Sequence, residues 1–372
     1  APIPSSLAAS ATACAWFPEE KATTPRARSV SGIRVSRENA PRALNAPLFS
    51  GRIRSVPEDF VVEELPAFEA TGEGEHLLLS IRKRGMNTAF CAQNIARWAG
   101  IDERDVSYAG MKDRHAVTTQ RFSVRLPKKT APDVALLNNE ECQVLEAVWH
   151  NRKLARGALA GNRFVLTLRE LGGEREALER ALHGIQTQGV PNYFGEQRFG
   201  MEQANVGKAL GMFEGRRVDR AKRSIYLSAA RSYLFNLLLA ERVTLGNWNA
   251  PLDGEVWMLE GTKSIFGPEP MNDDIAARCA AMDIHPTGPM WGAGELRSQG
   301  AVLGLESQLP VLQPELCKGL EKADLRQERR ALRLLAKNLS WRFPAEGELP
   351  LSFELPPGAY ATSILAELGA FA

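Results

Sequence analysis

The segment YAGMKDRHAVTTQRFSVRL, Tyr108–Leu126, begins as a turn and continues as a strand. Gly110 favours the turn because it has no Cβ and adopts backbone angles that other residues avoid. Apolar residues at Phe122, Val124 and Leu126 then alternate with polar ones, which is typical of a half-buried strand. The pattern therefore predicts a turn that is held in place by the strand that follows it.

One carboxylate lies in this turn, at Asp113, with Lys112, Arg114 and His115 beside it. Neighbouring positive charge favours the ionised form, so we expect Asp113 to be charged at neutral pH. Such a carboxylate can act as a nucleophile or as a base. The local pattern alone is more typical of a surface turn in which Asp113 balances its basic neighbours, and catalysis is the alternative.

The string GMKDRHAVTTQ, residues 110–120, resembles the catalytic motif of the TruD family of tRNA pseudouridine synthases. Further segments are similar to other motifs of this family, in the same order along the chain. They are PEDF (57–60), GEGEHLLLSIRKRGMNT (72–88), the Gly161-Asn162-x-Phe164 pattern, VPNYFGEQRFG (190–200), the run 227–243, TGPMWGAGE (287–295) and LPPGAYATSILAEL (355–368). The resemblance covers residues 51–368. It implies an α+β fold: a pseudouridine synthase catalytic domain with a mixed, largely antiparallel sheet, plus an inserted, mostly α-helical TRUD domain.

The resemblance also implies a reaction, the isomerisation of uridine to pseudouridine in tRNA, at uridine 13 of the D arm. Asp113 would be the catalytic residue, either attacking C1′ of the ribose or removing a proton from C2′ to give a glycal. No redox change occurs, so no cofactor is required, and no metal site is expected.

The same resemblance implies a set of residues at the substrate. Phe164 would stack on the base, and Asn162 would orient its loop by hydrogen bonds. Lys112 and Arg114 would keep Asp113 ionised and hold phosphate. The full set is Phe60, Lys112, Arg114, His115, Asn162 and Phe164.

Two other classes of function are compatible with these residues. The first is a non-catalytic RNA-binding protein or tRNA chaperone that uses the same cleft. The second is a small-molecule hydrolase or lyase in which Asp113 acts with His115. The hydrolase is disfavoured because no Ser, Cys or second carboxylate follows in matching proximity.

Composition limits the class of protein further. The chain has 372 residues, 44% of them hydrophobic and 24% charged, which is ordinary for a soluble globular protein. No apolar run is long enough to span a membrane. Five scattered cysteines without a CxxC pair favour neither disulfides nor zinc, so we expect a reducing, cytoplasmic environment. We expect a monomer without a protein partner.

Charge is unevenly distributed although the net charge is only +2. Residues 147–169 contain five basic and no acidic residues, and a second basic cluster lies at 216–223. Such patches bind a phosphate backbone or form solvated surfaces. The side chains most expected to touch RNA in the insert are Arg198, Arg223 and Arg231.

The chain divides into four parts by pattern. Residues 1–47 are rich in Ala, Ser, Pro and Arg without periodicity, which predicts a disordered N-terminal extension with no secretory signal. The catalytic domain is expected at 48–187 and 336–372, with the TRUD insert at 188–335. Predicted helices are one capped by Thr88 and ended by Gly100, and others at 203–213, 227–243, 273–282, 324–338 and 361–368.

Overall fold

The computed structural model describes residues 40–44 and 48–372. Its strands are β1 (Phe49–Arg52), β2 (Phe60–Pro66), β3 (His76–Arg84), β4 (Val106–Tyr108), β5 (Val117–Arg125), β6 (Cys142–His150), β7 (Leu159–Gly172), β8 (Val190–Pro191), β9 (Trp257–Leu259), β10 (Ile265–Phe266), β11 (Ile284–Met290), β12 (Glu328–Ala331), β13 (Arg333–Leu334), β14 (Lys337–Trp341), β15 (Leu349–Leu355) and β16 (Gly369–Phe371).

The chain also contains helices, several of them consecutive, beside these largely antiparallel strands, which confirms the predicted α+β class. The α-helices are α1 (Thr88–Ala99), α2 (Arg175–Gln188), α3 (Ala204–Phe213), α4 (Arg220–Thr244), α5 (Asp273–Ala280), α6 (Gly300–Glu306), α7 (Leu309–Leu312), α8 (Pro314–Lys322) and α9 (Ala361–Leu368). The short 3-10 helices are η1 (Pro57–Asp59), η2 (Glu103–Asp105), η3 (Val134–Leu137), η4 (Glu196–Arg198) and η5 (Met201–Gln203). None of the helices within 40–44 and 48–372 is long and apolar enough to cross a membrane.

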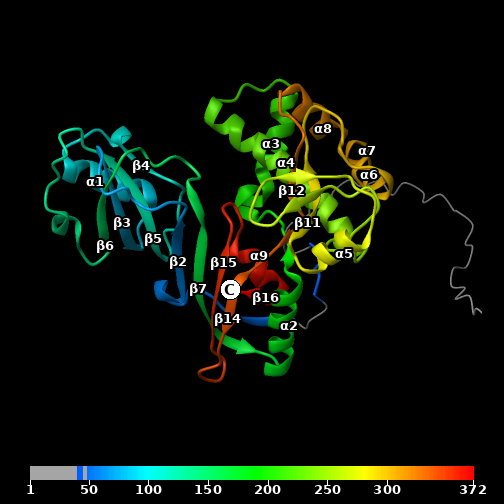
Figure 1. Cartoon of the computed structure of the whole chain (residues 1–372), viewed down its shortest axis with the longest axis horizontal. Helices are drawn as coiled ribbons and strands as arrows, with labels where there is room; N and C mark the ends of the chain where they lie inside the picture. The colour runs from blue at the N-terminus through cyan, green and yellow to red at the C-terminus, as the bar shows by residue number, and fades with distance from the viewer. Residues whose placement is uncertain (1–39, 45–47) are drawn as a thin grey trace, which may run out of the picture. The chain divides into compact units, whose positions relative to one another are not determined.

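The larger sheet comprises ten strands of the described chain, and its main path runs β14-β15-β7-β2-β5-β3-β6. Strands β1, β16 and β4 pair beside this path. Pairing is antiparallel except between β2 and β5 and between β1 and β16. The sheet is therefore mixed and largely antiparallel, as the sequence predicts, and Figure 1 shows β2, β5, β3 and β6 side by side.

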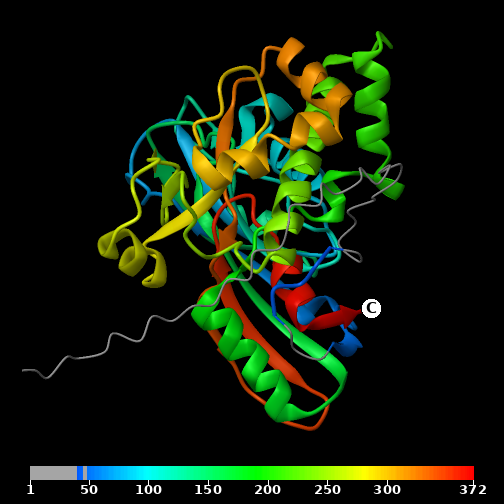
Figure 2. The same ribbon diagram turned by 90° about the vertical axis from the view of Figure 1, so that its right-hand side faces the viewer.

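Two hydrophobic cores lie against this sheet. Helix α1 buries Cys91 and Ile95 against Leu79 and Phe122 of β3 and β5. Helices α2 and α9 bury their apolar faces in a second core with residues of β7, β14 and β15. In Figure 2, α2 lies along β14 and β15. Each amphipathic helix thus covers part of the face that the catalytic strands leave apolar.

The N-cap of helix α1 lies one residue before the predicted cap, Thr88. Asn87 is the N-cap, and its side chain accepts a hydrogen bond from the Phe90 N–H. Thr88 is therefore the first helical residue, and its hydroxyl is available for another partner. The predicted C-terminal stop is confirmed, because Gly100 adopts the left-handed conformation with φ 65°.

The insert contains the expected helices α3, α4 and α5, and it also contains strands that the sequence pattern did not reveal. Helices α3, α4 and α8 share one hydrophobic core (Figure 1). Strands β10, β9, β11 and β12 form a separate four-stranded sheet among the described residues. These strands are short, and β11 contains two prolines, so periodicity gave little sign of them.

The predicted basic helix at 324–338 is wrong. This segment forms β12, β13 and the start of β14. The prediction placed leucines on one side of this helix and its arginines around the rest, as an RNA face or a solvated surface, whereas Arg329 and Arg333 are nearly buried. Arg329 pairs with Glu306 at 2.7 Å, and β12 pairs with β11. Partners distant in sequence override the local helical pattern.

The predicted disordered extension is wrong at its end, for residues 40–44, while residues 1–39 and 45–47 lie outside the described part. The Glu367 carboxylate accepts hydrogen bonds from the N–H groups of Ala43 and Leu44 at 3.1 and 2.9 Å. Arg42 donates to the carbonyl of Ala366 at 3.0 Å, near the end of α9. A buried carboxylate that holds two backbone donors explains why this segment is ordered.

A charged cluster joins β14 to the small sheet. Glu260 receives hydrogen bonds from His285 Nε2 and Lys337 Nζ, both at 2.7 Å. Arg333 Nε donates to His285 Nδ1 at 2.9 Å, so the imidazole proton lies on Nε2. The hydrogen bond from His285, followed by that from Lys337, lowers the pKa of Glu260 to about 2.

This depressed pKa predicts a dependence of stability on pH. A carboxyl whose pKa is lower in the folded state than in the unfolded chain stabilises the fold at pH values above its ordinary pKa of 4.5. This stabilisation is lost as the pH falls to about 2. Urea unfolding between pH 5 and about 2 should therefore show a smaller loss of stability for Glu260→Gln than for the parent. The exposed Glu346→Gln is the control, and parallel pH profiles for parent and Glu260→Gln would contradict the prediction.

Candidate active site

The turn that carries Asp113 is fixed by two buried polar side chains. The Lys112 N–H donates to the Thr88 hydroxyl at 3.0 Å, and that hydroxyl donates to Gln120 Oε1 at 2.9 Å. Gln120 Nε2 donates to the Gly110 carbonyl at 3.1 Å. Helix α1 and strand β5 thus hold the part of the turn that leads to Asp113. The one-residue shift of the helix cap is what frees Thr88 for this contact.

Both oxygens of Asp113 have a donor. The His115 N–H donates to Oδ1 at 3.0 Å, and Arg54 donates to Oδ2 at 2.7 Å. The side chains of Asp113 and Arg54 are 27% and 33% exposed, so the pair is oriented and still open to a substrate. A carboxylate in this state can attack carbon or accept a proton.

Arg54 is a site residue that the sequence interpretation missed. Its guanidinium carbon lies 4.2 Å from the ring centroid of Phe60, in a cation–π contact. Its backbone adopts φ 63°, which is uncommon for a residue other than glycine. The only sequence signal was its place three residues before the PEDF motif. Phe60, predicted at the substrate, is 4% exposed and supports Arg54 instead.

Lys112 does not pair with Asp113, in contrast to the expectation from sequence. Its Nζ lies 3.1 Å from Glu64 Oε2 and donates to Asn162 Oδ1 at 2.8 Å. The Lys112 and Glu64 side chains are only 7% and 3% exposed, so their charges neutralise each other out of water. Glu64 is a second residue that was missed. Asn162 contacts the turn through this hydrogen bond from Lys112, and its role in orienting the site remains a prediction.

Phe164 lies in a row of aromatic rings and is 8% exposed. Its ring stacks on Phe353 with centroids 5.5 Å apart and meets the Phe60 ring edge to face at 6.3 Å. This packing fixes the ring beside the residues that support Asp113. Stacking of Phe164 on a base remains a prediction.

The other two predicted residues, Arg114 and His115, have exposed side chains. Neither side chain has a hydrogen bond, ion pair or ring contact with the rest of the described chain. Their side chains therefore do not build the site, and their contact with a substrate remains a prediction.

The three insert arginines expected to contact RNA differ in their surroundings. Arg231 pairs with Glu328 at 3.1 Å and donates to the carbonyls of Met290 and Arg326, so it holds the insert together. Arg223 is exposed. Arg198 donates to the Ser228 hydroxyl at 2.9 Å and lies near the ring of Phe194.

A buried lysine lies close to the catalytic turn. Lys83 is 1% exposed, and its Nζ donates to the Met86 carbonyl at 2.7 Å, just before α1. Burial lowers its pKa to about 8, while the charge of Asp113 opposes that shift. Lys83 therefore adds positive charge near Asp113 and fixes the approach to α1.

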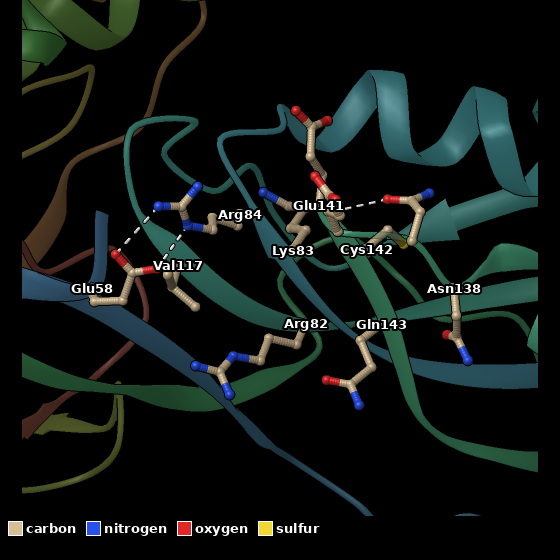
Figure 3. A pocket seen from close by; sticks show the side chains of 11 residues that line it. Glu58, Arg82, Lys83, Arg84, Val117, Asn138, Glu141, Cys142 and Gln143 are labelled. Atoms are coloured by element: carbon tan, nitrogen blue, oxygen red, sulfur yellow. Dashed lines mark hydrogen bonds and ion pairs between the residues drawn. The ribbon is translucent and has the colours of Figure 1, made fainter. Parts of the chain in front are cut away.

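Figure 3 shows a cavity of about 470 Å³ that Lys83 lines together with Cys142. Glu58 and Arg84 form an ion pair at 2.7 Å within its lining. None of the residues predicted at the substrate lines this cavity.

A family model described as tRNA pseudouridine synthase D (TruD) matches residues 42–214 and 213–368. A protein of Xanthomonas euvesicatoria pv. vesicatoria (strain 85-10), named tRNA pseudouridine synthase D, is 55% identical over 347 residues, covering 88% of this chain and 94% of that protein. A protein of the same name from Methylococcus capsulatus (strain ATCC 33009 / NCIMB 11132 / Bath) is 48% identical over 336 residues, covering 90% and 95%.

A crystal structure from Methanosarcina mazei, described as a TruD candidate, shares the fold. The TM-score is 0.68 at 20% identity, over 88% of this chain and 95% of that one. The family match includes the Asp113 turn, Arg54, Glu64 and Asn162 within one continuous range, and the closing helix α9 lies in the second range. On this match and these identities, the chain belongs to the tRNA pseudouridine synthase D (TruD) family.

Proposed function

We propose that this chain is an isomerase that converts uridine to pseudouridine in tRNA, and that its target is uridine 13 of the D arm. The names of the relatives support the reaction. The observation that carries the proposal is the Arg54–Asp113 pair, because it presents an oriented, partly exposed carboxylate at the motif that resembles the family's catalytic one.

The reaction breaks the bond between N1 and C1′, rotates the base and joins C5 to C1′. The proton on C5 leaves, and N1 gains a proton. Asp113 acts at the sugar, either by forming a bond to C1′ or by taking the proton from C2′, and then reverses that step. Arg54 orients the carboxylate for this step through its hydrogen bond to Oδ2.

The ion pairs around Asp113 determine which cation contacts it. Lys112 is neutralised by Glu64, so Arg54 is the cation that contacts Asp113 among the residues described. The Thr88 and Gln120 hydrogen bonds fix the turn without adding charge. Exact placement of a reacting group contributes strongly to rate, which gives these neutral contacts a role in catalysis.

The first test uses tRNA labelled with tritium at C5 of uridine. We expect the parent to release tritium, because joining C5 to C1′ expels that atom. Asp113→Asn should bind tRNA with unchanged affinity and release none. Asp105→Asn, a change at a half-buried carboxylate without an ion pair in the described structure, is the control. Binding without release by the parent would contradict the enzyme and leave an RNA-binding protein or chaperone.

The second test addresses the position. Transcripts that carry cytidine in place of uridine 13, and otherwise the parent sequence, should release no tritium. Replacing a different uridine of the D arm should leave release unchanged. Continued release from the transcript without uridine 13 would show that the target lies elsewhere, while the reaction itself would stand.

The third test separates two neighbouring carboxylates of β2. Glu64→Gln removes the counter-charge of nearly buried Lys112 and should lower the single-turnover rate about tenfold or more, because the turn shifts. Glu63→Gln is the matched control. It removes only a half-exposed pair with Arg163 at 3.9 Å, and the rate should stay within about twofold. Equal rates for the two variants would exclude a role for the Lys112–Glu64 pair.

A further inference from the structure

Two arginines of the insert share one aromatic ring. The guanidinium carbon of Arg330, in β12, lies 4.1 Å from the ring centroid of Phe194. That of Arg198, in η4, lies 5.5 Å from the same centroid. Like charges placed this close together repel, so the arrangement costs free energy unless a negative charge joins them.

Neither arginine has a carboxylate partner among the described residues. Arg330 donates to Asn192 Oδ1 at 2.6 Å, and Arg198 donates to the Ser228 hydroxyl at 2.9 Å. The Nε atoms of both are buried without a hydrogen-bond partner. Burial lowers the pKa of Arg330 to about 10, and the charge of Arg198 adds to this effect. Both side chains remain partly exposed, so a ligand can reach them.

Other buried arginines of the insert show that this chain pairs such charges where they serve the fold. Arg242 lies 2.9 Å from Glu255, and both side chains are 1% exposed. Arg329, the residue next to Arg330, lies 2.7 Å from the buried Glu306. Arg333 is also buried without an ion pair to a carboxylate of the described chain, but the His285 ring and two backbone carbonyls accept its hydrogen bonds. Within the described residues Arg330 has neither a carboxylate nor a partner for its Nε, which marks it as a cation that can take its counter-charge from a ligand.

Hydrogen bonds hold Phe194 and Asn192, the residues that contact these arginines, in place. Asn236 of α4 accepts a hydrogen bond from the Phe194 N–H at 2.9 Å and donates to the Phe194 carbonyl at 3.0 Å. Asn192 donates to the Ala331 carbonyl at 2.9 Å while it accepts from Arg330. Donors fixed in this way bind a ligand without a further loss of side-chain entropy.

The chain itself limits the distance from this cluster to the active site. Leu355 pairs with Asn162, the residue that holds Lys112. Tyr360 follows Leu355 by five positions, which span at most about 18 Å. Tyr360 lies against Gly195 and within electrostatic reach of Arg330. The two sites are thus separated by a distance that a few nucleotides can cover.

We propose that Arg198 and Arg330 together bind one backbone phosphate of the substrate RNA, a few nucleotides from the target uridine. The inference rests on the proposed function, since RNA is the anion that this function supplies. Guanidinium groups match the geometry of phosphate oxygens, and a phosphate between them relieves their repulsion. Phe194 forms the floor of this phosphate site.

The test measures binding of tRNA over a range of salt concentrations, in an Asp113→Asn background so that no product forms. Arg330→Gln and Arg198→Gln should each weaken binding about 10- to 100-fold and lower the salt dependence, log K against log salt, by about one unit. Arg330→Lys should keep the parent's salt dependence because it keeps the charge. Arg180→Gln, at an exposed residue of α2, is the control for loss of one positive charge.

A purely structural role gives different results. If Arg330 only clamps Phe194 and Asn192, Arg330→Gln lowers the melting temperature and leaves the salt dependence of the folded protein unchanged, which would overturn the proposal. If Arg330→Gln does not fold, the salt dependence of tRNA binding by Arg198→Gln decides between the two roles.

A second measurement locates the phosphate. In tRNAs with one uncharged methylphosphonate linkage, one position near the target should weaken binding by the parent but not by Arg330→Gln. If the loss of affinity from the methylphosphonate and the loss from Arg330→Gln simply add at every position, the proposal is overturned. Tritium release by the parent distinguishes an error in the phosphate site from an error in the proposed function. If only the phosphate site is wrong, the parent still releases tritium. If the proposed function is wrong, the parent releases none.

Discussion

The register between β2 and β7 is the constraint on which the site depends. Glu64 pairs with Asn162, Val62 with Phe164, and Phe60 with Leu166. Side chains alternate between the faces of a strand, so a slip of one residue would move all of these side chains to the opposite face. Lys112 would then lose both of its partners, and Arg54 would lose the ring beneath it. The register is secured by the buried apolar members of the same pairs. Hydrophobic burial and active-site geometry are thus specified by one set of strand contacts.

The sequence predicted this arrangement best where the signal is local. Strand β5 and helix α9 follow from alternation and amphipathic spacing. The turn before β5 is present, but Gly110 does not adopt the positive φ that only glycine favours. Asp113 was predicted as a site residue because it lies within one continuous motif. Arg54 and Glu64 were missed because their partners lie 59 and 48 positions away. No periodicity records such a contact, and only the fold of β2 against β5 and β7 brings the groups together.

The same limit explains the error at 324–338. A run of arginines between leucines favours a solvated helix when only neighbours are counted. In the structure Arg329 and Arg333 are nearly buried because Glu306 and the His285 ring receive their hydrogen bonds. Composition shows that charged residues are present, but it does not show whether a carboxylate distant in sequence pairs with them in the fold. Residues 40–44 show the converse, because an unremarkable Ala-rich segment is ordered by Glu367, more than 320 positions away.

The charged groups of the described residues differ in how they are paired, and the difference bears on their roles. Arg242 and Arg329 are matched with carboxylates and hold the insert together, at little net gain over apolar residues but at high cost if one partner is removed. Lys112 is matched with Glu64 and fixes the catalytic turn. Arg54 and Asp113 are matched with each other yet stay partly exposed, as the proposed role of Asp113 at a substrate requires. Arg198 and Arg330 lack a carboxylate within the described residues, and in our proposal a bound phosphate offsets the cost of placing them together.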